Sequence, residues 1–310
     1  MGVPANKQVI CDVLKENVIR DKDIVALCSD SRGSASMASF FEEFPENSIE
    51  VGIAEQNLVT ISAGLAACGK RPFAISPASF LAARSYEQIK IDVGYSHTNV
   101  KLIGISGGVS YGALGSSHHS AQDIAAVSGL PNLRVYLPSD HRLTRRLMEE
   151  LVRDDEPAYV RVGRNASPEV YADDPEFIMD KAVTVREGDD MTVIACGDMV
   201  RAAMDASDEL KKEGIACRVL DMYCIKPIDK EAVLNAAKET GHILTIEEHS
   251  IIGGLGSIVC SITAQECPVP VSCMALPDSE IVTGNQREVF DYYKLNAEGI
   301  VSRAKELLKR

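Results

Sequence analysis

The chain has 310 residues, 45% of them hydrophobic, which suffices for two ordinary domains with large cores. The formal net charge of −13 excludes the basic surface that nucleic-acid binding requires. No apolar run approaches the ~20 residues of a membrane span. The first residues show no signal-peptide pattern, and the nine cysteines include no CxxC pair. We therefore predict a cytoplasmic protein that binds neither nucleic acid nor membrane.

The first half of the chain alternates short β-branched runs with helical patterns. Strands are expected at 23–28, 71–76, 100–106, 133–137 and 158–162. Helices are expected between them at 57–68, 85–95, 120–130 and 141–152. Such alternation indicates a mostly parallel sheet with helices on both faces.

The composition changes at residues 166–182, which are polar and acidic and contain two prolines, as an interdomain linker would. Strand patterns then return at 191–196, 216–221, 242–247 and 269–276. Helical patterns accompany them at 201–214 and 229–241, the second with Asp229 as its N-cap. We predict an α/β protein of two domains, 1–165 and 183–310, joined by the linker 166–182. Each domain is expected to be a mostly parallel sheet covered by helices.

The segment VGIAEQNLVTISAGLAACGK (51–70) carries a single carboxylate, Glu55, at the start of an apolar helix. An acid in the first turn can simply interact with the helix dipole. It can also be a carboxyl group at a strand–helix junction, where open α/β sheets bind ligands. In apolar surroundings such a group can share a proton with a ring nitrogen.

Phe80 follows a strand directly in a chain with only 5% aromatic residues. It is either a core residue or a ring that stacks on a heteroaromatic ligand. Further on, SGGVSYGALGSSHHSAQD (106–123) is rich in glycine but lacks the GK[ST] of a phosphate-binding loop. His118, His119 and Asp123 could ligate a metal, yet adjacent histidines rarely face one ion. A substrate-contacting loop is the favoured interpretation.

Two further segments can bind anions. SDSRGSAS (29–36) follows the first strand, and Ser34 or Ser36 either caps the next helix or binds an anion at its N-terminus. Arg161 and Arg164 end another strand, where a guanidinium could bind a phosphate.

In order, the motifs EVGIAEQNLVTISAGLAACGKRPF, SFLAARSYEQIKID, GALGSSHHSAQDIAAVSGLPNLRVYLPSD and PAYVRVGR resemble the pyrimidine-binding domain of transketolase-type thiamine diphosphate enzymes. LKKEGIACRVLDMYCIKPID and EEHSIIGGLGS resemble their C-terminal domain. The family's GDG…N diphosphate and metal motif is absent. The resemblance therefore implies the C-terminal subunit of a split transketolase, whose partner chain carries the diphosphate-binding domain and most magnesium contacts. It also implies an α2β2 assembly that contains a dimer of this chain.

The resemblance implies a role for each matching residue. Glu55 is expected to be catalytic, because the family's glutamate hydrogen-bonds N1′ of the aminopyrimidine. The other implied contacts are the pyrimidine ring (Phe80), the cofactor surroundings (Asp30), the reacting end of the donor (His118) and the substrate phosphate (Ser34 and Arg164). No metal ligand is expected, and Lys7, His119 and Asp123 receive no role.

Two positions depart from the family. Leu114 stands where ordinary transketolases have an acid that contacts a donor hydroxyl, and Ser106 where they have a phosphate-contacting histidine. Loss of a hydrogen bond to a substrate hydroxyl alters specificity strongly. The cofactor chemistry is thus expected to be intact, while the substrate can be a branched or otherwise modified ketose phosphate.

The expected function is transfer of a two-carbon ketol unit from a ketose phosphate to an aldose acceptor, with thiamine diphosphate and magnesium. Two alternatives remain open at this point. One is the β subunit of a 2-oxo-acid dehydrogenase, which has a similar length and domain order. The other is a non-catalytic partner subunit.

Overall fold

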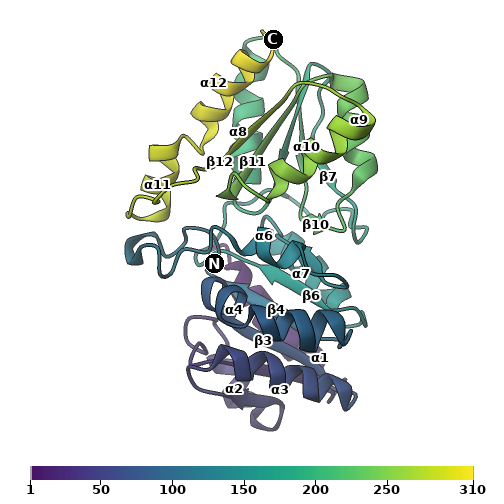
Figure 1. The fold of residues 1–310 in the computed structure, drawn as a ribbon, viewed down its shortest axis with the longest axis vertical. Coiled ribbons are helices and arrows are strands. Elements are labelled where there is room, and N and C mark those ends of the chain that lie inside the picture. Colours follow the sequence, from purple (N-terminus) through teal and green to yellow (C-terminus); the bar gives the residue numbers. More distant parts are fainter. Residues whose placement is uncertain (1, 310) are drawn as a thin grey trace.

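The computed structural model describes residues 2–309, and in it each run expected as a strand forms one. The larger of two sheets has seven strands in the order β10-β5-β6-β4-β3-β1-β2 (Figure 1). They are β1 (Ile24–Cys28), β2 (Ser48–Glu50), β3 (Arg71–Pro77), β4 (Lys101–Ile105), β5 (Arg134–Tyr136), β6 (Ala158–Arg161) and β10 (Cys224–Lys226). β1 to β6 pair in parallel, and β10 pairs antiparallel with β5.

Helices cover both faces of this sheet. They are α1 (Asn6–Val18), α2 (Ala38–Glu43), α3 (Glu55–Ala67), α4 (Ala78–Arg84), α5 (Tyr86–Gln88), α6 (Asp123–Ser128) and α7 (His141–Leu151). Short 3₁₀ segments η1 (Pro45–Asn47) and η3 (Gly112–Leu114) and a π-helix η2 (Ile89–Tyr95) complete the set.

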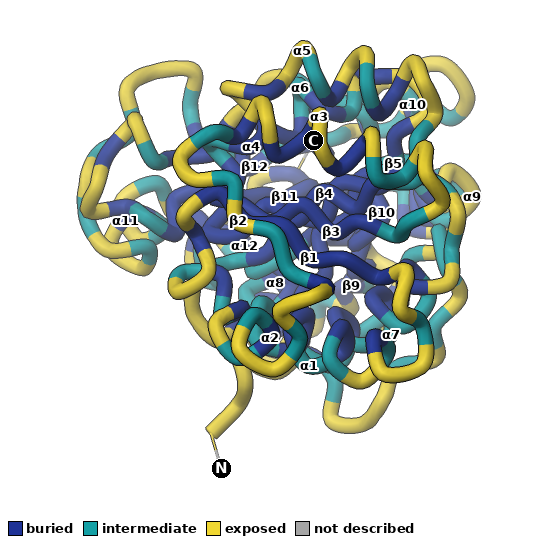
Figure 2. The backbone as a smooth tube through the Cα atoms, turned by 90° about the horizontal axis from the view of Figure 1, so that it is seen from below, coloured by how far each residue is buried: buried dark blue, intermediate teal, exposed yellow. Residues whose placement is uncertain are grey.

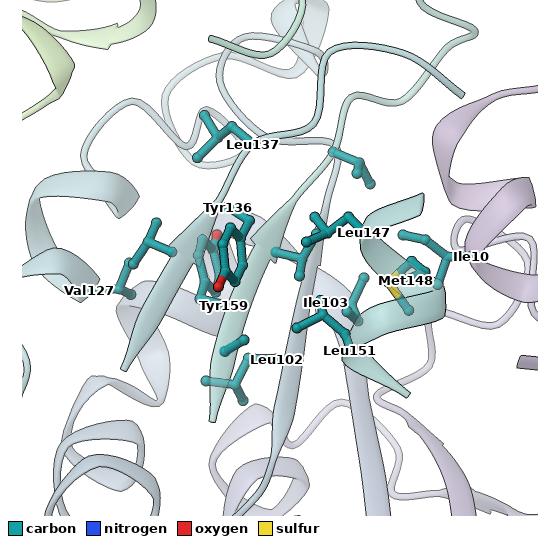
Figure 3. Packing of buried hydrophobic residues seen from close by; sticks show 14 of the residues in the cluster. Ile10, Leu102, Ile103, Val127, Tyr136, Leu137, Leu147, Met148, Leu151 and Tyr159 are labelled. Atoms are coloured by element: carbon teal, nitrogen blue, oxygen red, sulfur yellow. The ribbon is translucent and has the colours of Figure 1, made fainter. Parts of the chain in front are cut away.

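Helix α7 shows how the sequence produces this packing. Asp140 caps it, since its side chain accepts from the backbone N–H groups of Arg142 and Leu143, both at 3.0 Å. In Figure 3, Leu147, Met148 and Leu151 lie on one side of the sheet with Ile10 of α1, and Val127 of α6 lies on the other.

Figure 2 shows burial over the whole chain: the strands are buried, and the helices and loops that enclose them have exposed outer surfaces.

The second sheet has five strands in the order β12-β11-β8-β9-β7. They are β7 (Val183–Arg186), β8 (Met191–Ala195), β9 (Cys217–Asp221), β11 (Ile243–Ser250) and β12 (Val271–Leu276). Only β7, at the edge, is antiparallel to its neighbour. The helices are α8 (Met199–Lys212), α9 (Lys230–Thr240), α10 (Leu255–Glu266), α11 (Gln286–Tyr293) and α12 (Ala297–Leu307).

The short strand β10 connects the two halves of the molecule. It comes after β9 of the second sheet, yet it pairs with β5 at the edge of the first. Next to it, the Tyr223 and Tyr136 rings stack at 6.1 Å between centroids. The Tyr223 hydroxyl donates to the Ile178 carbonyl at 3.0 Å, in a stretch (162–182) without helix or strand. The sequence did not predict β10, because three residues carry too little pattern.

Three local expectations can be compared with the structure. Asp229 caps α9 as predicted, and its side chain accepts from the Ala232 N–H. Capping by Ser34 or Ser36 is wrong, because α2 begins at Ala38 and its N-cap, Met37, makes no side-chain bond. The helix expected at 85–95 is short and then continues as the π-helix η2. Within residues 2–309, none of the helices has the length and apolarity that a membrane crossing demands.

Candidate active site

The residues singled out from the sequence follow the carboxyl ends of parallel strands. Asp30 follows β1, Glu55 follows β2 and Phe80 follows β3. His118 lies in the loop after β4, and Arg164 follows β6. Because parallel strands end at the same edge, the topology brings these segments to one side of the first sheet, where open α/β sheets bind ligands.

Glu55 is the first residue of α3, and only 4% of it is exposed. This position agrees with both interpretations of Glu55, a ligand-binding carboxyl group at a strand–helix junction and an acid that interacts favourably with the helix dipole. The Arg84 Nη1 lies 3.2 Å from each carboxylate oxygen. About half of the Arg84 side chain is exposed (49%), so this partner can move away while Glu55 stays in place.

Phe80 lies in the first turn of α4, half-buried, and its ring is not part of the core. The Arg84 guanidinium lies over this ring, 4.0 Å from its centroid. A flat, polar group thus already stacks on Phe80 while hydrogen-bonding Glu55. An aminopyrimidine has the same two properties, so these residues fit the pyrimidine end of thiamine diphosphate.

The loop 106–122 brings His118 into contact with Phe80. The His118 ring lies edge-on to Phe80, with centroids 5.1 Å apart, and edge-on to Tyr111 at 5.6 Å. The Arg164 guanidinium in turn lies 4.6 Å from the Tyr111 centroid. A continuous row of side-chain contacts therefore leads from Glu55 to Arg164.

Positive charge gathers at the Arg164 end of this row. The Lys7 Nζ donates to the Ser34 carbonyl at 2.7 Å. Burial, and then the charge of Arg164, lower the pKa of Lys7. Lys7 and Arg164 repel each other beside Ser34, so an anion such as a phosphate bound between them would be held by both charges.

Ser34 and Asp30 have local hydrogen bonds of their own. The Ser34 hydroxyl donates to the Ser31 carbonyl at 3.0 Å. Asp30 is exposed, with φ at 53°, a conformation that aspartate tolerates. The Asp30 N–H donates to Glu50 Oε1 at 2.7 Å. Asp30 itself is exposed, at the side of the first sheet where the parallel strands end.

The two departures from the family lie at different depths. Leu114 ends η3 with 54% of its surface exposed. Ser106 is 1% exposed, has φ at 55°, and its Oγ has no hydrogen-bond partner among the described residues. An apolar side chain therefore stands at the surface of the loop, and an orphaned hydroxyl is buried at its start.

The other candidates of this region contact protein groups. His119 Nε2 lies 3.2 Å from the Gly112 carbonyl. Asp123 is buried, accepts from the Tyr159 hydroxyl at 2.8 Å, and pairs with Arg161 Nη1 at 3.2 Å. Between residues 2 and 309, no three His, Cys, Asp or Glu side chains gather as metal ligands would.

Sequence reasoning missed Arg84, Tyr111 and the place of Lys7. Arg84 stands four residues after Phe80, one helical turn away, which is the spacing that allows a cation to reach a ring. The sequence offers no comparable signal for the contact of Tyr111 with Arg164 or of Lys7 with Ser34, because each joins segments more than 25 positions apart.

Comparisons with known proteins were made for the whole chain. The transketolase pyrimidine-binding domain family matches residues 3–169, and the transketolase C-terminal domain family matches residues 180–300. An apulose-4-phosphate transketolase subunit of Phocaeicola vulgatus is 50% identical, over 99% of this chain and 100% of that protein. The 6-deoxy-6-sulfo-D-fructose transketolase subunit SqwH of a Clostridium species is 36% identical, over 96% and 93%.

A solved structure described as a split-gene transketolase, an inactive β4 tetramer, superposes with a TM-score of 0.89. It is 35% identical and covers 99% of both chains. These comparisons do not favour the 2-oxo-acid dehydrogenase or the non-catalytic alternative. Members of the matching family depend on thiamine diphosphate. With its pyrimidine-binding and C-terminal domains, this chain belongs to the transketolase family, as a subunit of the split type.

Proposed function

We propose that this chain transfers a two-carbon ketol unit from a branched or otherwise modified ketose phosphate, with apulose 4-phosphate as the first candidate donor, to an aldose acceptor. The observation that carries the proposal is the row of contacts from Glu55 through Phe80 and His118 to Arg164. It joins a pyrimidine-type site to a cationic site. Leu114 and Ser106 support a modified donor, as does 50% identity to a subunit named for apulose 4-phosphate.

Each residue has a part in this proposal. Glu55 holds a proton against the pyrimidine N1′, and Phe80 stacks on the ring once Arg84 has moved. Thiamine diphosphate, when bound, supplies the carbon nucleophile that accepts the ketol unit. His118 hydrogen-bonds the reacting end of the donor, and Asp30 lies near the cofactor.

The phosphate of the donor lies between Lys7, Ser34 and Arg164. This placement would relieve the repulsion from Arg164, which adds to burial in lowering the pKa of Lys7. A guanidinium and an ammonium form stronger hydrogen bonds to phosphate than neutral donors do. The phosphate also orients the donor so that its carbonyl carbon faces His118.

A second chain completes the site in this proposal. It carries the diphosphate-binding domain with the magnesium ligands, and the assembly is an α2β2 tetramer that contains a dimer of this chain. The active site then lies between subunits, so this chain alone has no turnover. The assembly is expected to be cytoplasmic.

The test is turnover after this chain is mixed with its diphosphate-binding partner, thiamine diphosphate and magnesium. Apulose 4-phosphate, 6-deoxy-6-sulfofructose and xylulose 5-phosphate would each be offered with an aldose phosphate acceptor. Preference for apulose 4-phosphate supports the proposal. Equal or better turnover of xylulose 5-phosphate would reduce it to an ordinary split transketolase, and turnover of a 2-oxo acid alone would overturn it.

A further inference from the structure

The loop 106–122 carries His118, and its conformation depends on the second half of the chain. It leaves β4 in the first sheet and enters α6, but residues beyond 195 surround it. In Figure 1 it extends sideways beneath α11. The contacting residues of the second half are Glu248, Ser250, Thr283, Gly284 and Gln286.

The start of the loop lies against Glu248, a buried residue at the carboxyl end of β11. Glu248 Oε1 accepts from the Val109 N–H at 2.8 Å, and Glu248 Oε2 lies 3.5 Å from Arg161. Gly108 has φ at +58°, and a Cβ there would lie 2.2 Å from Glu248 Cδ. The backbone therefore approaches this carboxyl group as closely as only glycine permits.

The middle of the loop lies against the first turn of α11. Asn285 caps that helix through a capping box with Glu288, which fixes where Gln286 points. The Gln286 side-chain amide donates to Glu248 Oε1 and to Asp198 Oδ2, both at 3.1 Å. Gln286 thereby holds in place the carboxyl group that binds the loop.

The loop and the N-terminus of α11 also meet through backbone. The Gly284 N–H donates to the Gly112 carbonyl, and a Cβ on Gly112 would lie 2.2 Å from the Gly284 oxygen. At the end of the loop, the Ser250 N–H donates to the Ala121 carbonyl at 2.7 Å. Start, middle and end of the loop are thus all bonded to the second half.

We infer that the C-terminal domain positions His118, and that Gln286 and Glu248 are positioning residues for the donor. Neither side chain touches the row of contacts from Glu55 to Arg164. Glu248 acts through the loop backbone at Val109, and Gln286 acts through Glu248 and through the Ser110 hydroxyl, 3.4 Å from its amide nitrogen. This inference rests on the proposed role of His118. The inference assigns a part in catalysis to the C-terminal domain, although this domain contributes no side chain to the row of contacts from Glu55 to Arg164.

The test combines two measurements on Gln286→Ala. The first is hydrogen exchange of the amides in 106–122 in the purified chain, which should become about fivefold to tenfold faster, as loss of one or two hydrogen bonds predicts. The second is a double-mutant cycle with His118→Ala in the reconstituted enzyme. Gln286→Ala alone should lower kcat/KM for the donor about fivefold to tenfold and leave the dissociation constant of thiamine diphosphate, measured by calorimetry, unchanged.

In the His118→Ala background, Gln286→Ala should lower kcat/KM for the donor less than about twofold, because both substitutions act on the contact between His118 and the donor. Tyr223→Phe is the control: it removes a hydrogen bond between the second half and residue 178 but touches nothing in the loop. Unchanged exchange in 106–122, or additive kinetic effects, would overturn the inference. A His118→Ala enzyme with full turnover would instead overturn the proposed role of His118, whatever the exchange shows.

Discussion

The two ends of the candidate site are built in different ways. The proposed cofactor end consists of Glu55, Phe80 and Arg84, which lie within 30 positions of one another and are joined by Arg84, which contacts the other two. The donor end joins Lys7, Ser34, Arg164 and the loop 106–122, which come from four separate segments. A relative with another substrate can thus change the donor end residue by residue, while the cofactor end stays a compact unit.

The largest expected effect tests the cofactor end. Glu55→Gln keeps the size of the side chain but removes the carboxyl group that, in our proposal, holds a proton against the cofactor. Turnover of the reconstituted enzyme should fall at least about 100-fold, within the range that proton-transferring groups contribute. The control is Glu42→Gln, an exposed acid on α2. Turnover within a few-fold of the native enzyme would assign Glu55 to helix stability alone.

The next effect tests the cations of the donor end. Lys7→Ala and Arg164→Ala each remove a cation that we propose binds the donor phosphate, so the KM for the donor should rise about tenfold with kcat little changed. Lys211→Ala, an exposed lysine of α8, is the control. The decisive comparison is a donor without phosphate, whose KM should not respond to either change. An equal response would place the phosphate elsewhere.

An effect of similar size separates this chain from ordinary transketolases. Leu114→Asp restores an acid at the tip of the loop, so the ratio of kcat/KM for xylulose 5-phosphate over apulose 4-phosphate should rise about tenfold. Leu114→Met, which keeps the position apolar, should leave the ratio as it was. If both variants behave alike, specificity is set elsewhere at the donor end.

The smallest effect concerns neither end. Burial raises the pKa of Asp221 to about 7, and Tyr171 and Ser139 donate to this carboxyl group. The folded protein therefore holds a proton there that the unfolded chain releases near pH 4. This contribution to the unfolding free energy is present below pH 4 and is lost as the pH rises through 7.

Asp221→Asn should remove this pH-dependent contribution to the unfolding free energy. Between pH 5 and pH 8, the unfolding free energy of the variant should therefore fall less than that of the native protein, by on the order of 2 kcal/mol, when both are measured by denaturant titration. Donor and cofactor affinities should not change. An undiminished fall with pH would shift the cause to Glu247 and Glu248, whose pKa values burial also raises, to about 7 and about 8.

The sequence predicted what depends on local pattern. The buried parallel strand β1 is a continuous apolar run, and β4 is one after its first residue, Lys101; every residue of both is buried, so their pattern is unambiguous. Glu55 and Phe80 could be found because a lone acid or ring in its setting is unusual. The prediction of Ser34 or Ser36 as a cap failed because the helix begins only at Ala38, four residues after Ser34 and two after Ser36.

What the sequence could not predict depends on distant contacts. Arg84 is an ordinary arginine until the fold places it over Phe80 and against Glu55. Lys7 reaches the Ser34 carbonyl only because α1 lies beside the turn that contains Ser34. Gln286 is 168 positions from His118 in the chain, and no local pattern relates the two.

The crossing strand β10 also bears on how the protein is made. While the ribosome is still synthesising the chain, residues 24–161 can pair six strands of the first sheet. The outer edge of β5 gains its neighbour only after residues 224–226 have emerged, when β7, β8 and β9 have been synthesised as well. The nascent first domain therefore exposes an unpaired strand edge while some sixty further codons are translated. During this interval the edge can pair with another chain or be bound by a chaperone.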